Sequence, residues 1–404
     1  MDEAQETKNK TLLQINECLH FSTGKITQQV GETAIIAGWN SFIAYSVREP
    51  AIPSKSRIIK VGTCLNSYIH YVENLVFDRE GLSSRLATKS LVNHIKSIKP
   101  DIVQLHNIHD HWLNYRILFE YLNSTDIKVV WTFHDCWAFT GHCFHFVTKD
   151  CQRWKTECHD CPLQGEYPKT LLDRSRKNFE LKKRLFTSNL NLTIVGCSNW
   201  MAGLVRQSFL KDKRIEVIHN GIDLNVFKPS GSRPNDGTFR VLAVSNVWNK
   251  GKGYYDILKL REYLPSDYEI IIVGLTADQL KELPIGIKGI QRTQNVQEMV
   301  DLYSSADVLI NPTYADTFPT INIEALACGT PVITYKTGGS PEIIDGKTGI
   351  VVEQGNLDAL TNAITSLREN PLDSKECRKR AEALFNKEER FKDYINLYEQ
   401  LLKQ

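Results

Sequence analysis

The 404-residue sequence lacks any apolar run near the roughly 18 residues that a membrane-spanning helix needs. Its first ten residues, MDEAQETKNK, contain no apolar stretch, so we expect no signal peptide. Neither sign of charge is in excess: 49 basic against 47 acidic residues leave a net charge of +2, too balanced for bulk binding of nucleic acid. We find no repeat of fixed period and no low-complexity segment. These absences favour a cytoplasmic globular protein without a nucleic-acid partner.

Two short motifs are also missing. The complete dinucleotide fingerprint G-x-G-x-x-G does not occur, which argues against a nicotinamide enzyme. No Asp-x-Asp pair occurs either, so a common arrangement of carboxylates for a divalent cation is absent. Candidate chemistry must therefore be sought in other patterns.

Apolar runs rich in branched residues alternate with segments of helical period along the whole chain. The alternation predicts an α/β fold with parallel sheets covered on both faces. Helical period is clearest at 82–99 and 297–306. The predicted strands are 11–16, 101–106, 128–133 and 192–197 in a first set, and 239–245, 269–274, 307–312, 331–334 and 349–352 in a second.

The segment FKPSGSRPNDGT (227–238) separates the two sets and has the composition of a linker. We therefore expect a first domain over 1–226 and a second over 239–385. The tail 386–404 has one apolar stripe at helical spacing and could pack on either domain. Two open α/β domains in tandem would leave a cleft at the carboxyl ends of their strands, where such sheets bind ligands.

The densest polar group lies in ADTFPTINIEALACGTPVITYKTGGSPEII (315–344), just after a predicted strand. Asp316 precedes Glu324 by eight residues. A helix beginning near Pro319 would present free backbone N–H groups and its positive dipole end to a phosphate or sugar oxygen. Carboxylates accept hydrogen bonds from hydroxyl groups, so the pattern favours a polyhydroxylated ligand that carries a phosphate. From spacing alone, Asp316 could equally be a capping acid and Glu324 a solvated helix residue.

This run resembles the donor-site signature of glycosyltransferase family 4, the glycosyltransferase group 1 domain. An acid is followed, after seven residues, by Glu-Ala-Leu-Ala-Cys-Gly-Thr-Pro-Val and then by Gly-Gly-Ser-Pro-Glu. The resemblance implies a GT-B fold, in which two Rossmann-like domains face a cleft. It also implies transfer of a sugar from a nucleotide-diphosphate sugar to an acceptor hydroxyl, with retention of anomeric configuration and without a metal or other cofactor.

The resemblance assigns several residues to the donor. Glu324 would hold the ribose and Asp316 the donor sugar, although Asp316 is one methylene shorter than the Glu usual in the family. Lys252, in NVWNKGKGYYDIL (246–258), would neutralise the diphosphate as the sugar leaves; in isolation, a Lys-Gly pair is an ordinary solvated turn. Asn246 stands where many relatives carry an Arg. The other donor-site candidates are Thr317, Phe318, Pro319, Thr320 and, in the strand-to-helix loop of FSTGKITQQVG (21–31), Gly24.

Histidines in the first domain resemble the acceptor side of the family's site. His134 follows a predicted strand in WTFHDCWAFTGHC, where a neutral imidazole could take or orient the proton of an acceptor hydroxyl. His106 and His109 lie in LHNIHDHW, together with His111. Three histidines so close together could instead bind a metal, or pack as polar groups at the end of a strand.

Four cysteines cluster in an irregular insertion at about 136–162. Cys143, Cys151, Cys158 and Cys161 have the spacing C-x7-C-x6-C-x2-C, which can close a tetrahedral zinc site. Such a zinc would be structural, because four protein ligands leave no open position for substrate. A reduced thiol cluster and two disulfides are the alternatives.

The resemblance points to synthesis of a cell-surface polysaccharide, such as a capsule, exopolysaccharide or O-antigen. The acceptor would be an oligosaccharide or a lipid-linked sugar, with peripheral association at the inner membrane face. A nucleotide-sugar epimerase of GT-B architecture and a non-catalytic protein that binds sugar nucleotides are the alternative functions.

Overall fold

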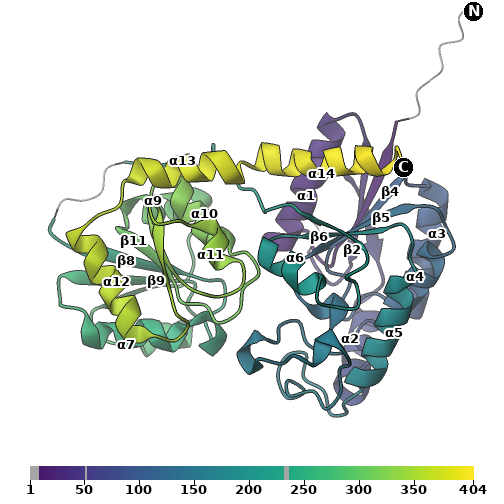
Figure 1. Cartoon of the computed structure of the whole chain (residues 1–404), viewed down its shortest axis with the longest axis horizontal. Coiled ribbons are helices and arrows are strands. Elements are labelled where there is room, and N and C mark those ends of the chain that lie inside the picture. The colour runs from purple at the N-terminus through teal and green to yellow at the C-terminus, as the bar shows by residue number, and fades with distance from the viewer. Residues whose placement is uncertain (1–8, 51, 232–235) are drawn as a thin grey trace, which may run out of the picture. The chain divides into compact units, whose positions relative to one another are not determined.

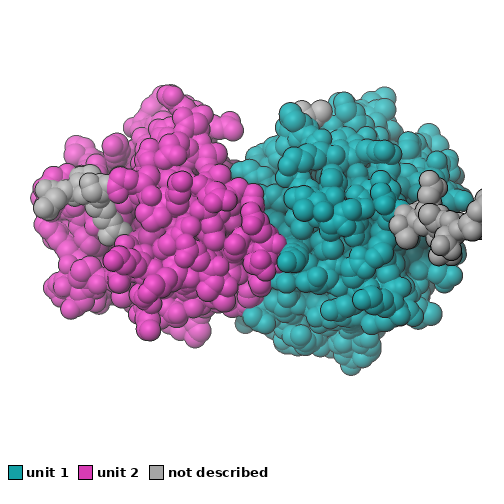
Figure 2. Space-filling view, turned by 90° about the horizontal axis from the view of Figure 1, so that it is seen from above, with its two compact units in different colours: residues 1–218, 391–404 teal, residues 219–390 magenta. Residues whose placement is uncertain are grey.

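The computed structural model describes residues 9–50, 52–231 and 236–404. Residues 1–8, which hold most of the segment inspected for a signal peptide, and 232–235, inside the predicted linker, lie outside the described residues. The chain forms two compact units, residues 1–218 with 391–404, and residues 219–390 (Figure 2). The boundary between Ile218 and His219 precedes the predicted linker.

Unit 1 is built on a seven-stranded parallel sheet with the strand order β3-β2-β1-β4-β5-β6-β7. Helices connect most successive strands, β2 and β3 excepted, and lie on both faces of the sheet (Figure 1). The strands are β1 (Thr11–Ile15), β2 (Asn40–Ser46), β3 (Arg57–Val61), β4 (Ile102–Leu105), β5 (Lys128–Phe133), β6 (Leu192–Gly196) and β7 (Arg214–Val217). The helices are α1 (Phe21–Ile36), α2 (Cys64–Phe77), α3 (Arg85–Ile98), α4 (Tyr115–Leu122), α5 (Ser175–Thr187) and α6 (Asn199–Val205).

Side-chain alternation along the strands explains the two layers of helices. Leu13, Val103 and Val129 point into a core shared with α3, α4 and α5. Their neighbours Leu12 and Ile102 point to the opposite face, where they pack with residues of α1. Because successive residues of a strand face opposite sides, continuous apolar runs are what a sheet covered on both faces requires.

Unit 2 repeats this plan with a six-stranded parallel sheet in the order β10-β9-β8-β11-β12-β13. The two predicted parallel sheets are thus confirmed. Its strands are β8 (Phe239–Val244), β9 (Tyr268–Val273), β10 (Ile287–Ile290), β11 (Val308–Asn311), β12 (Val332–Tyr335) and β13 (Gly349–Val352). Its helices are α7 (Tyr254–Tyr263), α8 (Ala277–Lys281), α9 (Val296–Ser305), α10 (Thr320–Ala327), α11 (Ser340–Ile343), α12 (Leu357–Glu369) and α13 (Ser374–Phe385).

The C-terminal helix α14 (Lys387–Leu401) packs on unit 1 from Phe391 onward. Phe391, Ile395 and Tyr398 of the predicted apolar stripe lie in one core with Leu12. This answers which domain the tail uses as its partner. No helix of the described residues combines the length and hydropathy needed to cross a bilayer.

Each sheet has one point where the strand order reverses. In unit 1 this point lies between β1 and β4, and in unit 2 between β8 and β11. In open parallel sheets, connections leave this point toward opposite faces, so the strand ends there open onto a crevice that binds ligands. Lys252 and Asp316 follow β8 and β11, and His106 and His109 follow β4, whereas His134 and the clustered cysteines follow the neighbouring strand β5.

Candidate functional site

In unit 2 the structure brings Lys252 and Asp316 together. The Lys252 ammonium donates to Asp316 Oδ2 at 2.8 Å, across 64 residues of sequence. Lys252 ends a short 3-10 turn in the loop after β8, and Asp316 lies in the loop after β11. Asp316 is not the cap of α10, which is Pro319; its Oδ1 instead accepts the N–H of Phe318 at 3.2 Å.

Two glycines allow the close contacts between backbone segments that hold Lys252 and Asp316 together. Gly253 has φ +72°, and a Cβ there would lie 2.1 Å from the carbonyl oxygen of Pro312, directly after β11. Gly338 has φ +54°, and its Cβ would lie 1.7 Å from the carbonyl oxygen of Asp316. A side chain at either position would therefore push apart the segments that carry the lysine and the carboxylate.

Glu324 lies on the second turn of α10 and is half-buried. Its Oε2 accepts a hydrogen bond from the hydroxyl of Tyr303 at 2.8 Å, on α9. A solvated surface acid would have no such partner, so Glu324 is held in place by the fold. We did not predict Tyr303 as a partner of Glu324 from the sequence.

The remaining donor-side candidates have differing environments. Phe318 is buried and stacks on His219, with ring centroids 4.8 Å apart. The carbonyl oxygen of Thr317 accepts the N–H of Gly339 at 3.2 Å. Asn246 is exposed after β8. No side chain caps the start of α10 at Pro319 and Thr320.

In unit 1, His106 and His134 form a hydrogen-bonded pair at the ends of β4 and β5. His106 Nδ1 lies 3.1 Å from His134 Nε2, and His106 Nε2 lies 3.2 Å from Gln14 Oε1. The amide of Gln14 donates to the carbonyl of Thr27 at 2.9 Å, so its oxygen faces His106. His106 must then donate through Nε2 and accept through Nδ1, which assigns the proton of His134 to Nε2.

Burial keeps both imidazoles neutral. It lowers the pKa of His134 to about 4, only partly offset by the negative charge of Asp135. It also lowers the pKa of His106 well below its ordinary value. Near pH 7 neither ring carries charge, so His134 can orient a hydroxyl but is a weak base toward its proton.

His109 has the opposite behaviour because it pairs with a carboxylate. Its Nε2 lies 2.8 Å from Asp135 Oδ2. Burial works against the imidazolium, but Asp135 raises the pKa of His109 above its ordinary value. The same pairing overcomes the effect of burial on Asp135 and lowers its pKa to about 2. His134 therefore interacts electrostatically with both members of the ion pair formed by His109 and Asp135.

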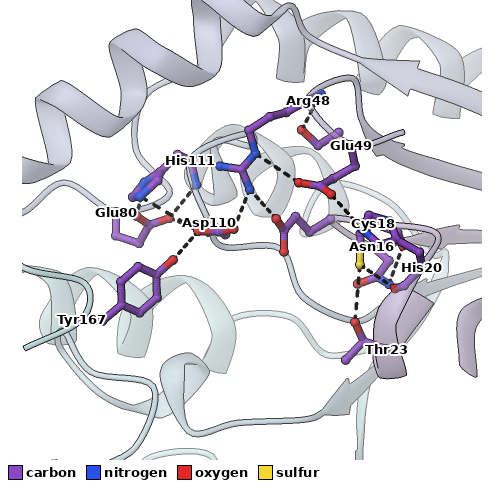
Figure 3. A network of polar contacts seen from close by, with 12 residues as sticks. Asn16, Cys18, His20, Thr23, Arg48, Glu49, Glu80, Asp110, His111 and Tyr167 are labelled. Carbon is purple, nitrogen blue, oxygen red and sulfur yellow. Dashed lines mark hydrogen bonds and ion pairs between the residues drawn. The ribbon is translucent and has the colours of Figure 1, made fainter. Parts of the chain in front are cut away.

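A larger polar network, which we did not predict, lies in the loops after β1, β2 and β4 (Figure 3). Arg48 contacts Glu17 and forms ion pairs with Glu49 and Asp110, with 2.6 Å between Nη2 and Asp110 Oδ2. Tyr167 donates its hydroxyl to the other oxygen of Asp110. A signal was present, because charged residues directly after the carboxyl ends of parallel strands are site candidates.

The two acids that share Arg48 differ in protonation. Burial, with the hydrogen bond and charge of Asp110, raises the pKa of Glu17 to about 10. Against the effect of burial, hydrogen bonds from Glu17 and Tyr167 and the charge of Arg48 lower the pKa of Asp110. The pair therefore holds one proton near pH 7, on Glu17.

The possible metal site among the histidines involves His111 rather than His106 or His109. Of the described residues, only His70, Glu80 and His111 place three ligand atoms within 4.8 Å of one another. However, His70 Nε2 accepts the N–H of Gly81 and Nδ1 bonds to Ser84, each at 3.0 Å. His111 pairs with Glu80 at 2.6 Å. Both nitrogens of His70 are thus already used, and the cluster fits a polar network better than a metal centre.

Gly24 and the cysteines complete the predicted set. Gly24 lies in the first turn of α1, where a Cβ would lie 2.3 Å from the backbone of Leu19. No side chain caps the start of this helix. All ten cysteines are free thiols, and four of them, Cys143, Cys151, Cys158 and Cys161, line one cavity in unit 1.

Comparison with known families decides the assignment of the chain. The glycosyl transferases group 1 model matches residues 238–370, and the glycosyltransferase family 4 model matches residues 50–226. The chain belongs to these glycosyltransferases. The match over 238–370 includes both Lys252 and Asp316.

Curated relatives agree with this assignment. A protein of Escherichia coli strain K12 named for colanic acid biosynthesis, the glycosyl transferase WcaC, is 25% identical over 321 residues, 75% of this chain and 77% of the relative. A D-inositol 3-phosphate glycosyltransferase of Arthrobacter sp. strain FB24 is 30% identical over 181 residues. That second match covers 39% of this chain and 42% of the relative.

Solved structures show that this glycosyltransferase has the GT-B fold, as predicted. Sucrose-phosphate synthase of Thermosynechococcus elongatus has a TM-score of 0.75 at 19% identity, over 98% of this chain and 100% of that one. Anabaena HepE in complex with UDP has a TM-score of 0.66 at 14% identity, over 97% and 100%. WaaG, a glycosyltransferase of lipopolysaccharide biosynthesis, has a TM-score of 0.62 at 15% identity, over 92% and 95%.

Proposed function

We propose that this glycosyltransferase moves a sugar from a nucleotide-diphosphate sugar to an acceptor hydroxyl with retention of anomeric configuration. The observation that carries the proposal is the pair formed by Lys252 and Asp316, 2.8 Å apart in the loops after β8 and β11. A cation beside an acid suits a substrate that joins a diphosphate to a polyhydroxylated sugar. Solved GT-B neighbours include complexes of HepE with UDP and UDP-glucose, which supports a donor of this class.

Residues of unit 2 would bind and activate the donor. Lys252 neutralises the diphosphate and the charge that grows on it as the bond to the anomeric carbon breaks. Asp316 orients the sugar, and Glu324, held by Tyr303, accepts hydrogen bonds from the ribose hydroxyls. The uncapped N-terminus of α10 adds backbone N–H groups. We infer that this positive charge and these donors replace a divalent cation, so that catalysis needs no metal.

Residues of unit 1 would position the acceptor. His134, neutral at pH 7, orients the acceptor hydroxyl, and its partner His106 fixes its ring. Because the pKa of His134 is only about 4, this ring does not keep the hydroxyl proton, which passes to an oxygen of the departing diphosphate as the new bond forms. We also assign Gly24 to the donor phosphates, because it lies in the uncapped first turn of α1, where backbone N–H groups are free.

A donor and product assay tests the proposal. The purified chain is incubated with a panel of nucleotide sugars, with and without oligosaccharide acceptors and with no Mg²⁺ added. We expect a glycoside with the anomeric configuration of the donor. An isomerised donor without acceptor would instead indicate an epimerase, and donor binding without turnover a non-catalytic protein.

We infer a role in cell-surface polysaccharide synthesis from the relatives. WcaC is named for colanic acid biosynthesis, and WaaG is described as involved in lipopolysaccharide biosynthesis. Such a pathway draws its nucleotide sugars from the cytoplasm, so we place the enzyme there, at the inner membrane face. Its acceptor would be an oligosaccharide or a lipid-linked sugar.

Helix α2 supports this membrane association, because its polarity is inverted. Its buried residues are the polar Ser67, His70 and Asn74. Its exposed face is apolar, whereas a helix on a soluble domain normally turns its apolar stripe inward. Patches of this kind mark partner or membrane surfaces. The exposed residues are Leu65, Tyr68, Ile69, Tyr71, Val72 and Phe77, with between 38% and 67% of each residue accessible.

Vesicle sedimentation tests this surface. Because α2 contains no Lys or Arg, we expect binding to neutral phosphatidylcholine vesicles that persists at high salt. Tyr68→Ser combined with Ile69→Ser should weaken it, whereas Ile285→Ser, at a fully exposed site of unit 2, should not. Recovery of the unsubstituted chain entirely in the supernatant would refute the membrane role.

A further inference from the structure

A long irregular segment of unit 1 is unexplained by the proposed function. Between Phe133 and Ser175, all of which the structure describes, regular structure is limited to 3-10 turns at Trp137–Phe139, Val147–Lys149 and Arg153–Lys155. Segments of this length without regular structure are uncommon inside a compact domain. Packing of Phe139, Phe146 and Trp154 stabilises part of this segment.

A thiol-lined cavity lies inside this segment. Its volume is about 10 Å³, close to the smallest that admits a single water or ion. Four thiols from three separate stretches of the segment converge on it, together with His142. The thiols are those of Cys143, Cys151, Cys158 and Cys161.

A backbone N–H group and the side chain of Lys182 lie near the thiol of Cys158. The N–H of Gly141 donates to Cys158 Sγ at 3.3 Å. Gly141 is required there, because a Cβ would lie 2.1 Å from the carbonyl oxygen of Ser175. The buried ammonium of Lys182 donates to the carbonyls of Trp137 and Thr140 at 2.7 and 3.1 Å, near enough to interact with the charge of Cys158. Backbone N–H groups and cations around sulfur are typical outer-shell partners of metal-bound thiolates.

His142 supplies an independent observation. Its Nδ1 is 2.8 Å from Asp78 Oδ1, and both side chains are 1% exposed. Its Nε2 is also buried and has no hydrogen-bond partner in the described structure, although buried polar atoms are almost always satisfied. The contact with the Asp78 carboxylate fixes the ring of His142, which also lines the thiol-lined cavity. A thiolate cluster would give it an acceptor.

We propose that Cys143, Cys151, Cys158 and Cys161 bind one structural Zn²⁺ as thiolates, with His142 Nε2 donating a hydrogen bond to one of the sulfurs. Zinc–sulfur bonds of about 2.3 Å require the sulfurs to be under 4 Å apart. No three of them lie mutually within 4.8 Å in this structure, so metal binding draws the segment together.

The metal content of the purified full-length chain tests the proposal. We expect one zinc ion per chain, retained through gel filtration. Cys143→Ser and Cys158→Ser should each lose it, whereas Cys64→Ser, at an exposed cysteine outside the cluster, should keep it. His142→Gln should also keep the zinc, because we assign all four ligand positions to sulfur. Loss of zinc from this variant would overturn the ligand set.

Cobalt substitution keeps the test decisive if a serine variant fails to fold. A tetrahedral Co²⁺ site with four thiolates gives intense sulfur-to-metal charge-transfer absorption and strong visible bands. We expect this spectrum in the unsubstituted chain. Absence of zinc together with absence of the charge-transfer band, or disulfides among the four cysteines by mass spectrometry, would overturn the proposal.

Discussion

At the scale of single residues, the polar network around Arg48 depends on where one proton lies. Glu17 and Asp110 both contact the guanidinium of Arg48, and Tyr167 donates its hydroxyl to Asp110. Burial and the charge of Asp110 raise the pKa of Glu17 to about 10, which makes Glu17 a neutral donor to the ionised Asp110. Asp110 and His111 also have positive φ values, so their backbone is held in a conformation that such residues rarely adopt.

This distribution of charge predicts that the two acids respond differently to amide substitution. Glu17→Gln keeps a neutral donor and acceptor in place, so we expect the free energy of unfolding to change by less than about 1 kcal/mol. Asp110→Asn removes the carboxylate that accepts from Arg48 and Tyr167, and should cost on the order of 1.5–3 kcal/mol. Urea denaturation at pH 7 measures both. Equal losses for the two variants would contradict the assignment of the proton.

The neutral state of His134 predicts a pH dependence of stability. Its pKa is about 4 in the folded chain against an ordinary value of 6.5, so between these values the unfolded chain binds more protons. Its contribution to stability is therefore complete above about pH 6.5 and is lost as the pH falls toward 4. Relative to the unsubstituted chain, His134→Gln should lose less stability between pH 7 and pH 5. A parallel pH dependence for the two proteins would show that His134 is not held neutral by burial.

Contacts between residues of different elements were the least predictable from the sequence. The pairing of Lys252 with Asp316 joins positions 64 residues apart, and only the resemblance to a family related them. Tyr303, Arg48 and Glu17 were not predicted. Each acts through a neighbour that the fold brings to it from another element, and no local spacing encodes such a contact.

At the scale of secondary-structure elements, the strands at the centre of each sheet were predictable from their apolar runs. Strands β1, β4, β5, β8 and β11 are buried over most of their length, and apolar residues therefore predominate in them. The strands β3, β7 and β10 were not predicted, and each lies at the edge of its sheet. An edge strand is less covered, so sequences such as RIIKV and RIEV carry charges that break the pattern. The near-edge strand β2 was missed as well.

The loops after β8 and β11 depend on glycine, which predicts an effect without any contact to a ligand. Gly338→Ala places a Cβ against the carbonyl of Asp316 at a left-handed φ. We expect a loss of about 1–3 kcal/mol in stability and a larger loss of donor binding, because the Asp316 loop must move. Gly346→Ala, where nothing lies within 4 Å of the new Cβ, is the matched control in the same unit. Thermal denaturation and calorimetric donor titration together measure the two effects. Unchanged donor binding in Gly338→Ala would show that the loop position does not matter.

At the scale of the whole molecule, two units of the same plan divide the chemistry. Each has a parallel sheet with one reversal of strand order, and each carries polar residues in the loops that follow the strands at or beside this reversal. Unit 2 holds the cation and acids that suit a nucleotide sugar, and unit 1 holds neutral histidines and a charged network. The division follows from topology, because it is the strand order that decides which loops meet.

The most direct test of the central claim is a titration of nucleotide-diphosphate sugars into the chain and two lysine variants, read by calorimetry and thermal denaturation. One donor at about 100 times its dissociation constant should stabilise the unsubstituted chain by about 2.7 kcal/mol. Lys252→Ala should weaken that binding by about 10-fold or more, since a charge-assisted contact to the diphosphate is lost. The ion pair is only partly buried and contributes little to stability, so the variant should fold normally. Lys250→Ala, two residues away in the same turn, should bind as the unsubstituted chain does. Equal donor affinity in Lys252→Ala and Lys250→Ala, or no binding of any nucleotide sugar, would contradict the account.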